Sequence, residues 1–280
     1  MLRALCPTEP AECDLAGSGQ PLWRAVEREL RAPLSAEPDT AAEPTRAVRD
    51  RRGQGFAGVC GELLSSGERV MVVCADVARR REGLERLVAG IAARVETGDD
   101  PEASACERLG VVSWDALAAD PSLGEPYQHL LALDPPLAPA GEQILARVPG
   151  SGFAHLAWGA EEAEFALAVA RHTLDLRDEL KALYRDLRRE PVIEGERLDA
   201  VLRGSGTHGR SPELAGRLVR VFAELGLVEA EGGGDSPRLR LLDAPGRTEL
   251  ERSPAYMAYL ARLSAAEAAL GAELPGRRAA

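Results

Sequence analysis

The sequence has no long apolar run, which sets it apart from membrane-spanning proteins. No stretch approaches the ~18 apolar residues that a membrane-spanning helix needs. The N-terminus also lacks a basic segment followed by a long apolar stretch. We therefore expect a cytoplasmic protein. With 280 residues, of which 45% are hydrophobic, the chain can bury a core without disulfide or metal staples.

Lysine and paired cysteines are scarce, and both shortages limit the available chemistry. The five cysteines form no Cys-x-x-Cys pair, so their spacing argues against a zinc site. Cys60 and Cys74 lie in apolar runs, and we interpret them as small core residues. Lys181 is the only lysine in the chain, so the lysine of a phosphate-binding loop cannot follow the apolar run 70–75.

Other catalytic signatures are missing as well. The sequence contains no Gly-x-Ser-x-Gly nucleophile elbow, and none of its four histidines adjoins an aspartate. His129 and His155 fall in apolar runs, where a hydrogen-bonded core histidine is the expected role. Asp76 and Asp134 follow apolar runs, where helix capping or an ion pair explains the first and a turn the second. A small-molecule enzyme that uses these aspartates remains the third hypothesis.

The apolar pattern predicts an α/β fold followed by a mainly helical region. Over residues 49–159, short apolar runs alternate with amphipathic helices, as in a small parallel sheet covered on both faces. This α/β domain has no phosphate loop. Over 160–272, helical spacing dominates, and two short strands joined by a glycine-rich segment follow the third helix. That order indicates a winged-helix-like domain. The predicted strands of the α/β domain are Val70–Ala75, Gly110–Ser113, His129–Leu133 and Phe153–Trp158.

The two ends of the chain differ from this regular pattern. Residues 11–48 predict a short helix at 22–30, with Trp23 and Val26 on one face, and then a linker poor in apolar residues. Such material does not normally begin a domain, so we expect a piece of a longer protein. Residues 273–280 are predicted to form a tail.

The helical domain carries the candidate nucleic-acid-binding residues. The whole chain has a formal net charge of −11, so contact with DNA needs a local basic surface. Arg217 and Arg220 are spaced to share one face of the third helix, which could enter a major groove while the hairpin follows the phosphates. Packing against protein is the alternative role for these arginines. The candidates are His208, Arg210, Arg217, Arg220, Arg238 and Arg240.

Several stretches between about residues 48 and 265 together resemble the C-terminal region of RecJ-like exonucleases. They are Val48–Gly53 with Phe56–Val59, Val70–Asp76 with Arg79–Arg80, Ala132–Pro136, Phe153–Gly159, Leu183–Arg185, Arg210–Leu214, Glu224–Val228 and Arg247–Tyr256. The resemblance implies a DHH-superfamily phosphoesterase. These enzymes degrade single-stranded DNA from the 5′ end with metal-activated water, in repair and recombination.

The chain departs from that family where the chemistry takes place. It has none of the Asp-His-Asp and Asp-His-His motifs that hold two manganese or magnesium ions in RecJ-like enzymes. No catalytic or metal-binding residue carries over, so the ions are expected in a missing catalytic domain. The resemblance implies that residues 1–10 hold the last strand of a missing oligonucleotide-binding domain, and that the chain is a C-terminal fragment without activity of its own.

The resemblance also implies partners. In some RecJ-like enzymes this region docks a single-strand-binding protein or a helicase, so we expect an accessory region that docks a partner and can contact single-stranded DNA. We expect neither a nucleotide nor a membrane as a partner. The alternative hypothesis is a free-standing winged-helix DNA-binding regulator whose α/β domain senses a small ligand.

Overall fold

The computed structural model describes residues 19–34, 43–95, 109–138, 141–206, 209–231, 237–243 and 248–273. These residues fall into two compact units. The α/β unit draws its described residues from 38–169 and from 266 onward, and the helical unit draws them from 14–37 and 170–265. The predicted strand at 2–5, the linker residues 35–42 and the tail from residue 274 lie outside the described residues.

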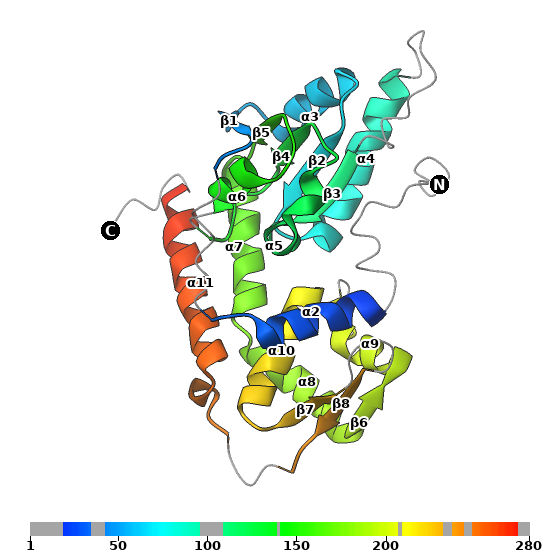
Figure 1. Ribbon diagram of the computed structural model, residues 1–280, viewed down its shortest axis with the longest axis vertical. Coiled ribbons are helices and arrows are strands. Elements are labelled where there is room, and N and C mark those ends of the chain that lie inside the picture. The colour runs from blue at the N-terminus through cyan, green and yellow to red at the C-terminus, as the bar shows by residue number, and fades with distance from the viewer. Residues whose placement is uncertain are drawn as a thin grey trace. The chain divides into compact units, whose positions relative to one another are not determined.

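The α/β unit contains a parallel sheet of five strands in the order β1-β5-β4-β2-β3 (Figure 1). Two of the predicted apolar runs form the central strand β4 and its neighbour β2, and all residues of both strands are buried. The strands are β1 (Ala47–Asp50), β2 (Val70–Cys74), β3 (Leu109–Ser113), β4 (His129–Ala132) and β5 (Phe153–Leu156). The parallel α/β prediction is therefore confirmed.

Helices connect these strands. On one face of the sheet, Leu63 and Leu64 of α3 pack against Val70 and Leu131, while Leu84 of α4 packs near Val72. Cys60 and Cys74 belong to the same clusters, as expected, and burial raises the pKa of the Cys60 thiol to about 12. The helices are α3 (Phe56–Ser65), α4 (Val77–Val95), α5 (Trp114–Ala119), the 3₁₀ turn η3 (Pro121–Gly124), α6 (Gly141–Arg147) and α7 (Ala160–Leu174).

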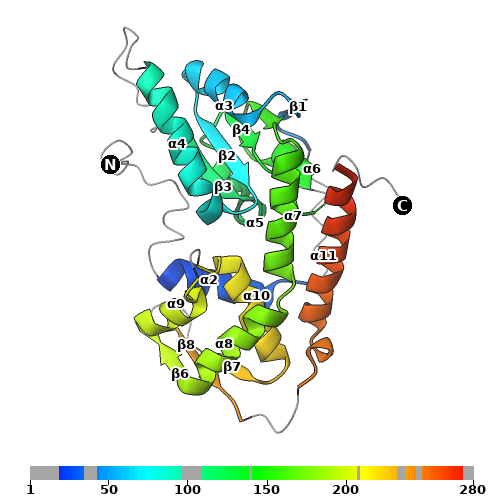
Figure 2. The same cartoon turned by 180° about the vertical axis from the view of Figure 1, so that it is seen from behind.

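The helical unit contains a three-stranded antiparallel sheet in the order β6-β8-β7, which lies at one side of the unit (Figure 2). Its elements are α2 (Gly19–Arg31), α8 (Arg177–Arg189), β6 (Val192–Glu194), α9 (Gly195–Arg203), α10 (Pro212–Glu224), β7 (Val228–Glu231), β8 (Arg238–Leu241), the 3₁₀ turn η4 (Leu250–Arg252) and α11 (Pro254–Glu273). Helices α7 and α11 each contribute residues to both units. No helix in the described ranges is long and apolar enough to cross a membrane.

Local signals in the sequence fix the ends of α10. The Ser211 hydroxyl accepts a hydrogen bond from the Leu214 N–H at 3.2 Å, and Pro212 occupies the first turn, where its missing N–H costs nothing. Gly226, just beyond the helix, has a φ of 66°, a left-handed conformation that favours glycine. These caps hold the helix in the register that the sequence predicted.

The N-terminal helix α2 is part of the helical unit rather than of a separate linker segment. Its residues Leu22, Trp23 and Val26 are buried, and it packs along α10. The contact is close because a Cβ on Gly216 of α10 would lie 3.0 Å from the carbonyl oxygen of Ala25. The helix predicted at 22–30 is confirmed, and its apolar face completes the core of this unit.

Candidate functional site

The carboxyl ends of β2 and β4 mark the position where a parallel α/β sheet usually binds a ligand. These two strands are neighbours in the sheet. The chain continues from β2 to β3, toward one edge of the sheet, and from β4 to β5, toward the opposite edge. The loops that follow the two strands therefore diverge, and a crevice normally opens between them. Asp76 and Asp134 stand at this position, as the sequence indicated.

Asp134 is buried at this edge of the sheet together with an arginine from α4. The Asp134 side chain has no exposed surface, accepts a hydrogen bond from the Ala75 N–H at 2.9 Å and forms an ion pair with Arg80. The Arg80 guanidinium in turn lies 3.7 Å from the centre of the Phe165 ring. Burial raises the pKa of the Asp134 carboxyl, and the bonds from Arg80 and Ala75 oppose that shift.

The backbone of Asp134 is also used. Its carbonyl oxygen accepts a hydrogen bond from the Trp114 indole N–H at 3.0 Å, which ties the end of β4 to the start of α5. Asp134 thus connects three loops at the carboxyl edge of the sheet. This supports the structural interpretation of Asp134 over a catalytic one.

Asp76 has a structural role of the kind the sequence suggested. One of its carboxylate oxygens accepts a hydrogen bond from the Arg79 backbone N–H at 3.0 Å, and the other pairs with the Arg79 guanidinium. Asp76 therefore caps the N-terminus of α4, where a carboxylate also interacts favourably with the helix dipole. Within the described residues, no three His, Cys, Asp or Glu side chains meet so that they could hold a metal ion. We call Asp76, Arg79, Arg80 and Asp134 the carboxyl-edge cluster.

The structure does not bring the predicted nucleic-acid-binding residues together on one surface. Arg217 and Arg220 lie on the buried side of α10, with 3% and 8% of their surface exposed. Arg220 donates a hydrogen bond to the Glu29 carbonyl oxygen of α2 at 2.7 Å and another to the Glu224 side chain at 3.2 Å. Arg217 donates to the Thr173 carbonyl oxygen at 3.2 Å. The expectation that these two arginines form an exposed basic face is corrected: α2 covers Arg220, while Arg217 lies against the end of α7 and 5.9 Å from the centre of the Tyr259 ring of α11.

The remaining candidates are used locally or fall outside the described residues. Arg210 is 8% exposed and donates to the Glu179 carboxylate at 2.6 Å and to the Val201 carbonyl oxygen at 3.0 Å. On β8, Arg238 pairs with Glu194 at 2.9 Å, and Arg240 pairs with Glu229 and Glu231. His208 lies outside the described residues. Each described candidate therefore faces an acidic side chain or backbone carbonyls of this same unit.

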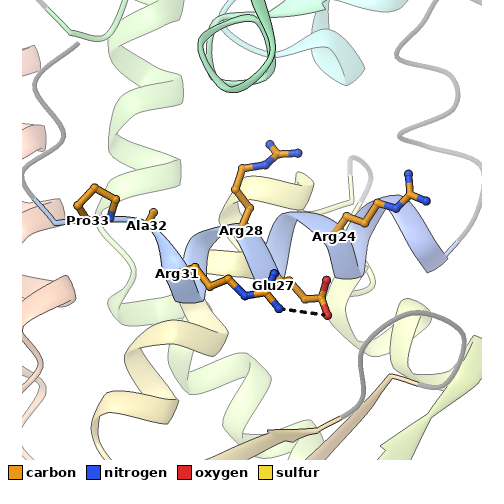
Figure 3. A pocket seen from close by; sticks show the side chains of 6 residues that line it. All are labelled: Arg24, Glu27, Arg28, Arg31, Ala32 and Pro33. Carbon is orange, nitrogen blue, oxygen red and sulfur yellow. Dashed lines mark ion pairs between the residues drawn. The ribbon is translucent and has the colours of Figure 1, made fainter. Parts of the chain in front are cut away.

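The outer face of α2 carries a basic surface that the sequence analysis did not single out. Arg24, Arg28 and Arg31 are exposed and recur at the i, i+4, i+7 spacing of one helix face. They line a shallow hollow of about 530 Å³ together with Glu27, Ala32 and Pro33, in which Arg24 and Arg28 extend to the same side (Figure 3). Glu27 lies 4.0 Å from Arg31. We call Arg24, Arg28 and Arg31 the α2 basic face.

The arginine spacing of this face is visible in the sequence, but the sequence alone does not distinguish it from that of any other exposed helix face. Arginines at helical spacing opposite buried Leu22 and Val26 are typical of any solvated surface helix. The structure adds two facts: the inward face of α2 is fixed in the core, and Glu29 is turned inward to Arg220 and Tyr259. Because Glu29 is turned inward, the exposed charges on the outer face of α2 are mainly those of arginines.

Comparison with models of protein families gives no match, and a search of curated proteins gives none either. The resemblance to RecJ-like exonucleases therefore rests on the sequence stretches quoted above.

Proposed function

We propose that the chain is a non-catalytic accessory region of a RecJ-like exonuclease, which docks a partner protein. The observation that carries this proposal is that the polar side chains at the candidate positions of both units are bonded within their own unit. Asp134, which follows β4, forms an ion pair with Arg80. On α10, Arg220 donates to the Glu29 carbonyl oxygen of α2, and Arg217 donates to the Thr173 carbonyl oxygen of α7.

The second unit supports a winged-helix module used for packing. Its order of helix, strand, two helices and two strands is typical of winged-helix domains, whose third helix reads DNA when that helix is exposed. Here the third helix, α10, is packed against α2 instead. This arrangement favours protein docking over the alternative of a free-standing DNA-binding regulator.

The α2 basic face is the docking surface of this proposal. Three exposed guanidinium groups on one helix face suit an acidic segment of a partner, since arginine pairs carboxylates with two parallel hydrogen bonds. The chain as a whole is strongly acidic, so this local basic surface must provide the attraction. The partners that fit the resemblance are a single-strand-binding protein and a helicase.

A binding titration with charge-reversal variants tests this proposal. The fluorescently labelled chain is titrated with a purified bacterial single-strand-binding protein, and anisotropy is recorded. The double variant R24E/R28E should weaken binding by tenfold or more, and its effect should shrink in high salt. The control R185E/R188E makes the same charge change at two exposed arginines of α8 and should bind like the original chain.

Two outcomes would overturn the proposal. If both double variants weakened binding equally, binding would depend on the net charge of the chain and not on the α2 basic face. Tight binding of duplex DNA that is lost in R238E/R240E would instead support the regulator hypothesis.

A further inference from the structure

Two buried histidines and a glutamate form a hydrogen-bonded chain at the amino end of the parallel sheet. His129, the first residue of β4, and His155 of β5 are only 6% and 3% exposed. The His129 Nδ1 and His155 Nε2 atoms are 3.0 Å apart, and the His129 Nε2 atom is bonded to the Glu68 carboxylate. Glu68 lies between α3 and β2, and half of its side-chain surface is exposed. The chain therefore links two strands and a loop to solvent.

Charged groups from two further elements face His155. Arg49 of β1, Arg51 just after β1 and Glu62 of α3 all act on its charge, and Arg51 donates a hydrogen bond to Glu62 at 2.9 Å. The His155 Nδ1 and Arg51 Nη1 atoms are buried without a hydrogen-bond partner in the described residues. Phe153 stacks against the His129 ring, with the ring centres 6.0 Å apart. The two imidazoles are thus enclosed on the side away from Glu68.

The rules of hydrogen bonding restrict the protons of this chain. A carboxylate only accepts, so the His129 Nε2 atom carries the proton shared with Glu68. When His129 is neutral, its Nδ1 atom must accept a hydrogen bond from the His155 Nε2–H. The bond between the rings survives when His129 gains one proton. The His129 Nδ1–H then donates to the His155 Nε2 atom, and the neutral His155 ring carries its proton on Nδ1 instead. A second proton leaves two donors facing each other, and the bond between the rings is lost.

We propose that the Glu68–His129–His155 chain is a pH-dependent latch. It links the amino end of β4 and His155 of β5 to the loop of Glu68 while at most one of the two imidazoles is charged, and it opens when both are charged. Burial, the neighbouring His129 and the arginines Arg51 and Arg49 lower the pKa of His155 to about 4, and Glu62 opposes them. The latch is accordingly closed at neutral pH.

The protons themselves are the first test. Imidazole ¹⁵N spectra of the full-length chain at pH 7.5, assigned with His129→Gln and His155→Gln, should show the proton of both rings on Nε2. A neutral His155 with its proton on Nδ1 at this pH would overturn the proposal. So would two histidines that titrate independently near the ordinary pKa of 6.5.

Hydrogen exchange then tests the opening. After correction for intrinsic rates, amide protection in peptides that cover 66–70, 129–133 and 153–156 should fall about tenfold between pH 7 and pH 4.5. Peptides of β3 in the same unit should change far less. Because Glu68→Gln removes the charge that favours protonation of His129, this mild surface variant should move the opening to lower pH. The control Glu82→Gln on exposed α4 should leave it unchanged. Loss of protection at the same pH in all three proteins would contradict the latch.

Discussion

Arg46 shows how a single residue can fix several loops of the α/β unit. Its buried guanidinium donates hydrogen bonds to the carbonyl oxygens of Gly124, Tyr127 and Val148 at 2.8–3.0 Å and to that of Pro149 at 2.7 Å. All of these acceptors are neutral, and burial lowers the pKa of Arg46. Among the described residues, backbone carbonyl groups stabilise its charge. Sequence spacing does not reveal this arrangement, because the partners lie about 80–100 residues away.

Replacement of Arg46 should therefore be costly. We expect Arg46→Met to lower the free energy of unfolding by about 3 kcal/mol, since several buried carbonyl oxygens lose their donors at once. Urea unfolding followed by circular dichroism measures the change. The control Arg86→Ala removes an arginine from an exposed i, i+4 pair with Glu82 and should cost less than about 0.5 kcal/mol. Equal losses in the two variants would contradict this role of Arg46.

His155 gives a second prediction at this scale, on the pH dependence of stability. Its pKa is about 4 in the folded chain and about 6.5 when unfolded, so the unfolded state binds more protons between these values. Stability should therefore rise with pH across this window and be lost as the pH falls from 6.5 to 4, by on the order of 3 kcal/mol. Urea unfolding of dilute protein at several pH values should show a shallower slope for His155→Gln than for the original chain or His172→Gln. Identical slopes would argue against the buried neutral imidazole.

Among the structural elements, the pairing of α2 with α10 bears most on the proposed docking function. The two helices approach closely at Gly216, where an added Cβ would meet the Ala25 carbonyl oxygen and the Glu29 Cβ at 3.0 Å each. Tyr259 of α11 joins this contact by donating a hydrogen bond to the Glu29 carboxylate. Burial and the Glu29 charge raise the pKa of the Tyr259 hydroxyl. Glu29 is thereby held between α10 and α11.

A larger side chain at Gly216 should separate the two helices. We expect Gly216→Leu to destabilise the chain by about 1–3 kcal/mol, because overpacking forces α2 away from α10. The control Gly58→Leu changes an exposed position of α3, where an added Cβ meets nothing within 4 Å, and should be neutral or slightly stabilising. Thermal unfolding compares the two variants. A Gly216→Leu chain as stable as the original would show that α2 is loosely placed.

The strands that could be predicted from the sequence are those formed by continuous apolar runs. Val70–Cys74 and His129–Ala132 were predicted because every residue in them is buried. Strand β1 (Ala47–Asp50) was missed because it lies at the sheet edge and all four of its residues are exposed. Strand β6 (Val192–Glu194) was missed because it buries only Ile193, so its position depends on pairing with β8. The burial of Arg217 and Arg220 could not be predicted from the sequence, since it depends on contacts with Thr173, 44 residues away, and with Glu29 of α2, 191 residues away.

For the whole molecule, the net charge and the internal bonds of the candidate residues both favour protein docking over DNA binding as the proposed function. A net charge of −11 repels nucleic acid at long range. The carboxyl-edge cluster uses both strand-end aspartates internally, and the arginines of α10 are buried. The α2 basic face is an exposed surface of the helical unit, and the docking proposal depends on it.

The central proposal is that this chain does not itself cut DNA. It is supported by the internal use of both strand-end aspartates, since Asp76 caps α4 and Asp134 bonds to Ala75 and Arg80. The most direct test is to incubate the purified full chain with 5′-labelled single-stranded DNA and manganese and to follow the strand by gel electrophoresis. The account predicts no shortening beyond that in buffer. Manganese-dependent shortening that disappears in Asp76→Asn or Asp134→Asn, with the fold of the variant intact by circular dichroism, would contradict it.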